Sequence, residues 1–214
     1  MKHLSLRRAV IAAARQMNAE GLSQGTSGNV SARVKGGMLI TPTGLPYGEL
    51  RPKDLCLLRL DGSAAEGGRT PSSEWRIHAD LYRARSEVSG IVHAHPLYAT
   101  TLSILRQEIP AVHYMIAVAG GPTVRCSGYA TFGSAELSER VQEALVGRQA
   151  ALLANHGLVA VGSSVEDAFR VAREVEVLAS QYWHALQVGT PVILSDAEIA
   201  RVIEKFQTYG QQER

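Results

Sequence analysis

Two histidines at the end of an apolar run are the first residues in this sequence whose types and spacing suggest chemistry. Residues 91 to 95 read IVHAH. On an extended strand, side chains two residues apart point to the same face, so the Cα atoms of His93 and His95 would lie roughly 7 Å apart. Two imidazoles at that spacing can bind one metal ion. The alternative is two unrelated polar residues that end a strand, and the pentapeptide alone leaves both interpretations open.

Two further residues could complete a metal site. His156 lies in ANHGL, a turn between two apolar runs where a side chain can face a cleft. Three neutral imidazoles form a catalytic zinc set whose fourth position takes water, substrate or a carboxylate. Glu74, in PSSEW, falls in the first turn of a predicted helix and is a candidate carboxylate, although a glutamate there also simply favours the helix dipole. For His78, four residues later, we expect a polar or packing role.

Small and hydroxyl-bearing residues indicate an anion site. The helix start at Ser72 and Ser73 combines hydroxyls with unpaired backbone N–H groups, which suits a phosphate. Two loops, GTSGN and TPTG, could complete it with Thr26, Ser27, Gly28, Asn29, Thr43 and Gly44. Loops of this composition are also ordinary turns. Neither matches a Walker motif or a GxGxxG motif.

The composition favours a small-molecule partner. The chain has 214 residues, of which 45% are hydrophobic and 20% charged, and a net charge of +2. We expect one domain over residues 1–214. Because no basic block is present, we expect neither a nucleic-acid partner nor a membrane partner. The first 17 residues predict an amphipathic helix rather than a signal peptide, and no apolar run reaches the length of a membrane span. The missing membrane span predicts a soluble cytoplasmic protein. Cys56 and Cys126 are expected to be reduced, buried and inert.

Helices and short strands alternate along the chain, which predicts an α/β fold of three α/β/α layers around a mixed, mostly antiparallel sheet. The hydrophobic patterns, caps and turns predict helices that begin near Ser5, Ser73, Pro96 and Ser134, and two closing helices at 165–188 and 195–210. Strands are expected at 29–34, 38–42, 55–60, 90–95 and 111–120, and two more within 151–162.

The order of these motifs resembles the class II aldolase/adducin family, the zinc-dependent sugar-phosphate aldolases and epimerases. Within that family the resemblance is strongest to the L-fuculose-1-phosphate aldolases. It covers nearly the whole chain, through SQGTSGNVS, MLITPTGLPY, PSSEWRIH, IVHAH, IPAVHYMIAVAGG, YATFG, NHGL, EVEVLA and EKFQTYG. Asn155, before His156, departs from the histidine of the fuculose-phosphate pattern without affecting a ligand position.

The resemblance implies a role for each matching residue. The zinc ligands fall on His93, His95 and His156, with Glu74 as a fourth ligand that becomes the acid/base when substrate displaces it. One Zn²⁺ per subunit is expected, and another divalent metal is possible. The substrate phosphate would lie among Thr26, Ser27, Gly28, Asn29, Thr43, Gly44, Ser72 and Ser73. The family implies a homotetramer with active sites between subunits, in which Tyr114 comes from the neighbouring subunit and Phe132 and Tyr209 line the aldehyde side.

The implied reaction is cleavage of a ketose 1-phosphate, most closely L-fuculose 1-phosphate, to dihydroxyacetone phosphate and L-lactaldehyde. Breaking the C3–C4 bond requires a base for the C4 hydroxyl proton and a means to hold the charge of an enediolate. Glu74 would protonate C3, and Tyr114 would handle the proton at the aldehyde oxygen. Four alternatives stay open: a 5-deoxyribulose or 5-methylthioribulose 1-phosphate aldolase, a ribulose-phosphate 4-epimerase, a family dehydratase or decarboxylase, and a non-catalytic adducin-like module.

Overall fold

A single seven-stranded sheet organises the computed structural model, which describes residues 2–65 and 68–208. The strand order is β3-β2-β1-β4-β7-β6-β5. Every neighbouring pair is antiparallel except β5 with β6, which is parallel. The strands are β1 (Asn29–Val34), β2 (Gly37–Ile40), β3 (Cys56–Arg59), β4 (Gly90–Ala94), β5 (Arg125–Ser127), β6 (Ala150–Leu153) and β7 (Gly157–Gly162).

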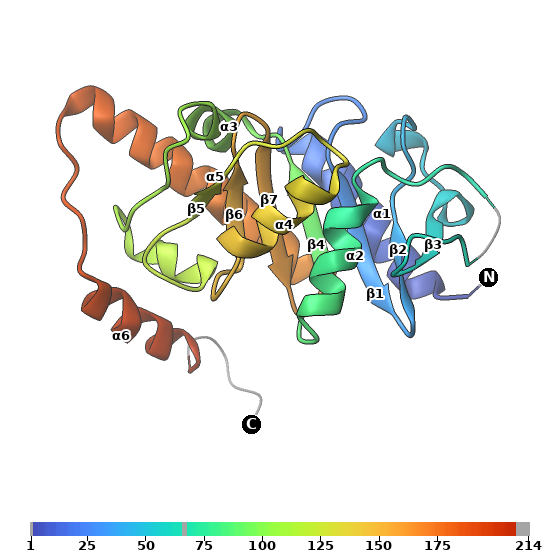
Figure 1. Cartoon of the computed structure of the whole chain (residues 1–214). Coiled ribbons are helices and arrows are strands. Elements are labelled where there is room, and N and C mark those ends of the chain that lie inside the picture. The colour runs from blue at the N-terminus through green and yellow to red at the C-terminus, as the bar shows by residue number, and fades with distance from the viewer. Residues whose placement is uncertain (1, 66–67, 209–214) are drawn as a thin grey trace.

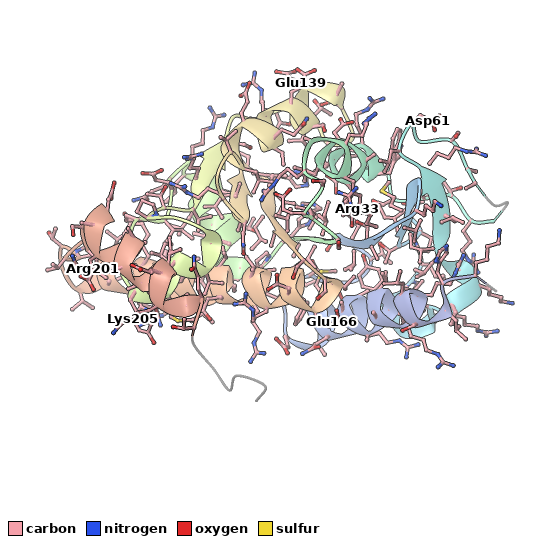
Figure 2. The ribbon with its side chains drawn as sticks, turned by 90° about the horizontal axis from the view of Figure 1, so that it is seen from below. Arg33, Asp61, Glu139, Glu166, Arg201 and Lys205 are labelled. Atoms are coloured by element: carbon pink, nitrogen blue, oxygen red, sulfur yellow. The ribbon has the colours of Figure 1, made fainter. Side chains whose placement is uncertain are left out.

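Helices cover both faces of this sheet (Figure 1). On one face, α1 (Leu4–Ala19), α3 (Leu97–Ile104) and α5 (Val165–Val188) pack on the strands, and on the other lie α2 (Trp75–Ala84) and α4 (Ala135–Ala144). These are the three α/β/α layers predicted from the sequence. Charged side chains such as Glu139 on α4 and Lys205 on the last helix lie on the outside (Figure 2).

Strand side chains alternate between two cores, as the pleat requires. On β4, Val92 and Ala94 join the core under α1 and α5, whereas Ile91 joins the core under α2 and α4. On β7, the corresponding pairs are Leu158 with Ala160 and Val159 with Val161. One sheet thus carries both cores, and the expectation of one domain over residues 1–214 stays a prediction.

The predicted strand over residues 111–120 is wrong. Tyr114–Ala119 forms a short 3-10 helix, η3, that begins where the His113 side chain accepts the backbone N–H of Met115 and ends at Gly120. Its apolar side chains join the core under α1 and α5, and η3 lies against α5 and α6 (Asp196–Phe206). A continuous apolar run is compatible with a buried strand or with a short helix, and here tertiary packing decides.

Three smaller differences from the sequence prediction concern β5, α2 and the cysteines. β5, which was not predicted, lies within a turn-rich stretch, and only three residues pair with β6. The helix α2 begins one residue after Glu74, which is its N-cap residue. Cys56 is buried as predicted, Cys126 is only half-buried, and both are free thiols.

Two further 3-10 turns, η1 (Tyr47–Glu49) and η2 (Pro52–Asp54), connect β2 to β3.

The helix α6 lies outside the three layers, against η3 (Figure 1). Its Ser195 cap accepts the N–H of Glu198, at the start predicted for the last helix. Among the described helices, none has both the length and the hydropathy that a membrane span requires.

Candidate metal centre

Four side chains from four places in the chain meet at one end of the central strands. His93 is on β4, His95 follows it, His156 lies in the turn between β6 and β7, and Glu74 precedes α2. One ligand atom from each lies within 4.8 Å of all the others. Sequence analysis brought these four residues together as candidates, and the structure places them in one cluster.

Close approach of the backbone makes this convergence possible at two glycines. A Cβ on Gly157 would lie 2.4 Å from the carbonyl oxygen of Ala94 and 2.7 Å from the His95 ring. A Cβ on Gly28 would lie 2.6 Å from the carbonyl oxygen of His93, and its φ of +74° is one that side-chain-bearing residues rarely adopt. Glycine at both positions lets the neighbouring chain segments press against the two histidines.

Hydrogen bonds orient the His93 ring for a metal. Its Nδ1 lies 2.8 Å from the backbone carbonyl oxygen of Leu158, so Nδ1 carries the proton that it donates there. Nε2 therefore faces the cluster, 3.0 Å from a carboxylate oxygen (Oε2) of Glu74 and 3.0 Å from Nε2 of His95. In metal-binding histidines, a hydrogen bond from one ring nitrogen to a carbonyl oxygen usually fixes the ring so that the other nitrogen faces the metal.

Charge in the cluster is balanced inside a buried space. Burial alone would raise the pKa of Glu74, but the neighbouring His93, then His156 and His95, hold it well below its usual range. Burial alone would lower the pKa of His93, but the opposite effect of the Glu74 carboxylate is larger, so the pKa of His93 is raised. Burial, together with His93 and His156, lowers the pKa of His95 to about 3, and burial with His93 lowers that of His156 to about 4. His95 and His156 are therefore neutral near pH 7, with lone pairs available as ligands.

The residues present fit a divalent metal. Three imidazoles and one carboxylate are the ligand types that zinc prefers. Glu74 Oε1 is buried and has no hydrogen-bond partner among the described residues, and His156 Nε2 lies 3.4 Å from it. An unpartnered buried carboxylate oxygen is costly unless a cation neutralises it.

A polar pocket of about 310 Å³ opens beside the cluster. Its lining includes most of the residues predicted to bind phosphate, namely Thr26, Ser27, Gly28, Asn29, Thr43, Ser72 and Ser73. Gly44 follows Thr43 but is not part of the lining. A volume of this size suits a small metabolite rather than a polymer.

The residues predicted for the aldehyde side separate in the structure. Phe132 lines the pocket and is 65% exposed. Tyr114 does not reach it and instead lies beside Phe206 on a different, apolar surface groove, 49% exposed. Tyr209 lies outside the described residues.

Four residues of the pocket lining were not predicted from the sequence: Pro42, Tyr129, Ala130 and Asn155. Two of them, Tyr129 and Asn155, have polar side chains. Tyr129 lies three residues before the predicted Phe132 in YATFG, and Asn155 directly precedes the predicted His156, so proximity in the chain was the available signal.

Comparison with known proteins places the chain in a family. The family model described as Class II Aldolase and Adducin N-terminal domain matches residues 8–183. The chain belongs to the class II aldolase and adducin family. A Rhodospirillum rubrum protein named 5-methylthioribulose-1-phosphate/5-deoxyribulose-1-phosphate aldolase is 48% identical over 97% of this chain and 93% of its own length. The L-fuculose phosphate aldolase of Escherichia coli strain K12 is 49% identical over 98% of each chain.

A solved structure of an L-fuculose 1-phosphate aldolase superposes with a TM-score of 0.94 at 40% identity, covering 97% of this chain and 98% of that one. The resemblance inferred from the motifs is thus confirmed, as is the fold. With its close relatives named as aldolases and its histidine–glutamate cluster intact, the protein is a class II, metal-dependent aldehyde-lyase rather than a non-catalytic module.

The partly buried His95 and His156 predict acid sensitivity of the metal-free aldolase. The pKa values of His95, about 3, and His156, about 4, lie below the ordinary 6.5, so the unfolded chain binds protons that the folded chain excludes. The free energy of unfolding should therefore fall as the pH drops from about 6.5 toward 4, by up to roughly 1.4 kcal/mol per pH unit for each histidine. Urea unfolding in EDTA at several pH values measures this. A His156→Asn variant should show a shallower slope, and constant stability between pH 7 and 4.5 would contradict the assignment.

Proposed function

We propose that this aldolase cleaves a ketose 1-phosphate between C3 and C4, releasing dihydroxyacetone phosphate and an aldehyde, with Zn²⁺ at Glu74, His93, His95 and His156. The observation that carries the proposal is the buried cluster of three histidines and one glutamate, opening directly onto a hydroxyl-lined pocket. When bound, the metal would act as a Lewis acid that stabilises negative charge developing on substrate oxygens. Cytoplasmic location stays a prediction from the sequence.

Phosphate recognition falls to the polar end of the pocket. Thr26, Ser27, Thr43, Ser72 and Ser73 bring hydroxyls to the lining, and Ser72 and Ser73 stand just before the first turn of α2. Hydroxyls and the N-terminus of a helix together attract a phosphate. A phosphate held there would direct the first carbons of the sugar toward the histidine cluster.

Glu74 is the residue we assign to move the proton at C3. It is buried, its pKa lies well below the usual range, and its Oε1 atom has no hydrogen-bond partner among the described residues. In the condensation direction the ionised carboxylate accepts the proton from C3. In cleavage Glu74 delivers a proton to C3, and this gain is balanced by the proton that the C4 hydroxyl loses, which Tyr114 would take at the aldehyde oxygen.

L-Fuculose 1-phosphate is the proposed substrate, with L-lactaldehyde as the aldehyde product. Lactaldehyde carries a hydroxyl beside its carbonyl, and Asn155 and Tyr129 bring polar groups to the lining of the pocket that Phe132 also lines. The second candidate is 5-methylthioribulose or 5-deoxyribulose 1-phosphate, whose aldehydes lack that hydroxyl. The exposed Phe132 and the relative from Rhodospirillum rubrum support it.

A homotetramer with shared active sites completes the proposal. Tyr114 is half-exposed and remote from its own pocket, so it would act in the pocket of a neighbouring subunit, at the aldehyde oxygen. Phe132 and Tyr209 are proposed to line the aldehyde side.

Substrate cleavage is the first prediction. Metal-loaded protein should release dihydroxyacetone phosphate, detected by a coupled assay, with a higher kcat/KM for L-fuculose 1-phosphate than for 5-methylthioribulose 1-phosphate. EDTA should abolish release from both sugars. Ribulose 5-phosphate is the matched control, since its phosphate is at the other end. Silence with both 1-phosphates from folded, metal-loaded protein would overturn the proposal, and a preference for the methylthio sugar would select the second candidate.

Glu74→Gln tests the acid/base assignment. The amide cannot accept the proton from carbon, so kcat should fall about 10²–10⁴-fold. The three histidines should still retain metal, which elemental analysis of the purified variant measures. Glu136→Gln, at an exposed glutamate on α4 that pairs with Arg140, is the matched control and should keep full activity. Wild-type turnover in Glu74→Gln would remove Glu74 from the chemistry.

Mixing variants tests whether Tyr114 acts across a subunit interface. Tyr114→Phe and Glu74→Gln should each lose most of the activity. After subunits are mixed and allowed to exchange, roughly a quarter of sites should combine an intact Glu74 with an intact Tyr114 from its neighbour, restoring activity in proportion. If Tyr114 acts only within its own chain, no site in the mixture regains both residues and activity stays at the level of the variants.

A further inference from the structure

A buried chain of polar side chains runs from the interior of the fold to Glu74. Tyr82 OH lies 2.8 Å from Ser31 Oγ, which lies 2.6 Å from Nδ1 of His78. The other ring nitrogen of His78, Nε2, contacts Oδ1 of Asn29, and Asn29 Nδ2 lies 3.1 Å from Oε2 of Glu74. All five side chains are buried, and His78 is 0% exposed.

The two elements that carry this chain face each other in register. Glu74, His78 and Tyr82 are spaced four residues apart, so they follow one face of α2 from its N-cap. Asn29 and Ser31 are two residues apart on β1 and point to the same side of the sheet. Asn29 also pairs directly with His93 on β4, which places the amide beside the metal cluster.

Chemistry fixes the direction of every hydrogen bond. The Glu74 carboxylate can only accept, so the Asn29 NH₂ group donates to it and the Asn29 carbonyl faces His78. That carbonyl needs a donor, so His78 Nε2 carries a proton. Burial lowers the pKa of His78 to about 3, so the ring is neutral and Nδ1 accepts from the Ser31 hydroxyl. Ser31 in turn accepts from Tyr82, whose pKa burial raises above its usual value, so that the phenol keeps its proton.

In each of the four hydrogen bonds, the donor is therefore the residue farther from Glu74 in the series and the acceptor is the residue nearer to it. Hydrogen bonds arranged head to tail in a low-dielectric interior polarise one another. The far end is closed by Arg33 on β1, labelled in Figure 2, whose guanidinium lies 4.7 Å from the centre of the Tyr82 ring. Arg33 also donates to the backbone carbonyls of Val88 and Arg85, which holds it in place.

We infer that His78 is a positioning residue for the Glu74 acid/base. Its Nε2–H fixes the orientation of the Asn29 amide, so that the amide NH₂ group donates a hydrogen bond to Glu74 Oε2. The other carboxylate oxygen, Oε1, then exchanges a proton with the substrate carbon. With the amide turned over, the Asn29 carbonyl would face the carboxylate and repel it. Apolar side chains would fill the space under α2 with a smaller desolvation cost, because buried polar groups stabilise a fold only when they are fully paired. The inference rests on the role proposed above for Glu74.

Substitutions at His78 test the inference through the proton transfer itself. His78→Phe fills the space without a donor, and His78→Gln restores an N–H that can reach Asn29. His78→Phe should lower kcat and the rate of hydrogen exchange between C3 of dihydroxyacetone phosphate and D₂O, each by about 10–100-fold. KM and bound metal should stay near wild type, and His78→Gln should recover most of both rates. His184→Phe, the same change at an exposed histidine on α5, is the control and should behave as wild type.

A spectroscopic measurement on the unaltered protein makes the test independent of whether the variants fold. Nitrogen-15 spectra of the histidine rings should show His78 as a neutral ring protonated at Nε2 and accepting at Nδ1. Protonation at Nδ1, or unchanged C3 exchange in a folded His78→Phe variant, would overturn the inference. If the wild-type protein neither cleaves ketose 1-phosphates nor exchanges C3 hydrogen, the proposed function fails instead, and the ring spectra still decide the hydrogen-bond chain.

Discussion

The constraint on which the structure depends is the packing of three imidazole nitrogens and a carboxylate into a space only a few ångströms across. His93 Nε2 lies 3.0 Å from both His95 Nε2 and Glu74 Oε2. Bare lone pairs at that distance repel, so a cation must lie among them, either a proton on His93 or a metal ion. The raised pKa of His93 and the lowered pKa of Glu74 have the same cause, because a protonated His93 and an ionised Glu74 stabilise each other. Strand pairing, two close glycine contacts and the start of α2 all serve to hold this arrangement together.

Sequence periodicity was sufficient to predict the part of the site that lies on regular elements. His93 and His95 share a face because strands alternate, and the turn at His156 was marked by glycine between two apolar runs. The hairpin of β1 with β2, the caps of α4 and α6 and the bounds of α5 follow from equally local signals. The three histidines meet, however, only because β4 pairs with β7, and the paired residues lie about 65 positions apart in the chain. The family resemblance predicted this meeting, whereas the spacing of the residues alone did not.

The failures of sequence reasoning have a common physical origin. Residues 111–120 have the composition of a buried strand, but they pack on helices, where a short 3-10 helix buries the same side chains. The roles predicted correctly for Glu74 and His78 also depend on other elements. The Glu74 side chain makes no capping bond and turns toward the histidines. His78 has the polar role expected of it, between Ser31 and Asn29 on β1. In each case the partner that determines the role lies on another element, which a local pattern does not contain.

The residues that line the pocket differ in burial and in the kind of element that carries them, and this difference suggests where substrate discrimination resides. The metal cluster and the Asn29 amide are fixed by buried strands and by the start of α2, with little room for substitution. Tyr129, Phe132 and Asn155 lie in connecting segments and are exposed. Connecting segments tolerate change more readily than buried strands do. Relatives named for fuculose phosphate and for methylthioribulose phosphate are 49% and 48% identical to this chain, which is expected if the shared chemistry is built into the strands and the choice of aldehyde into the loops.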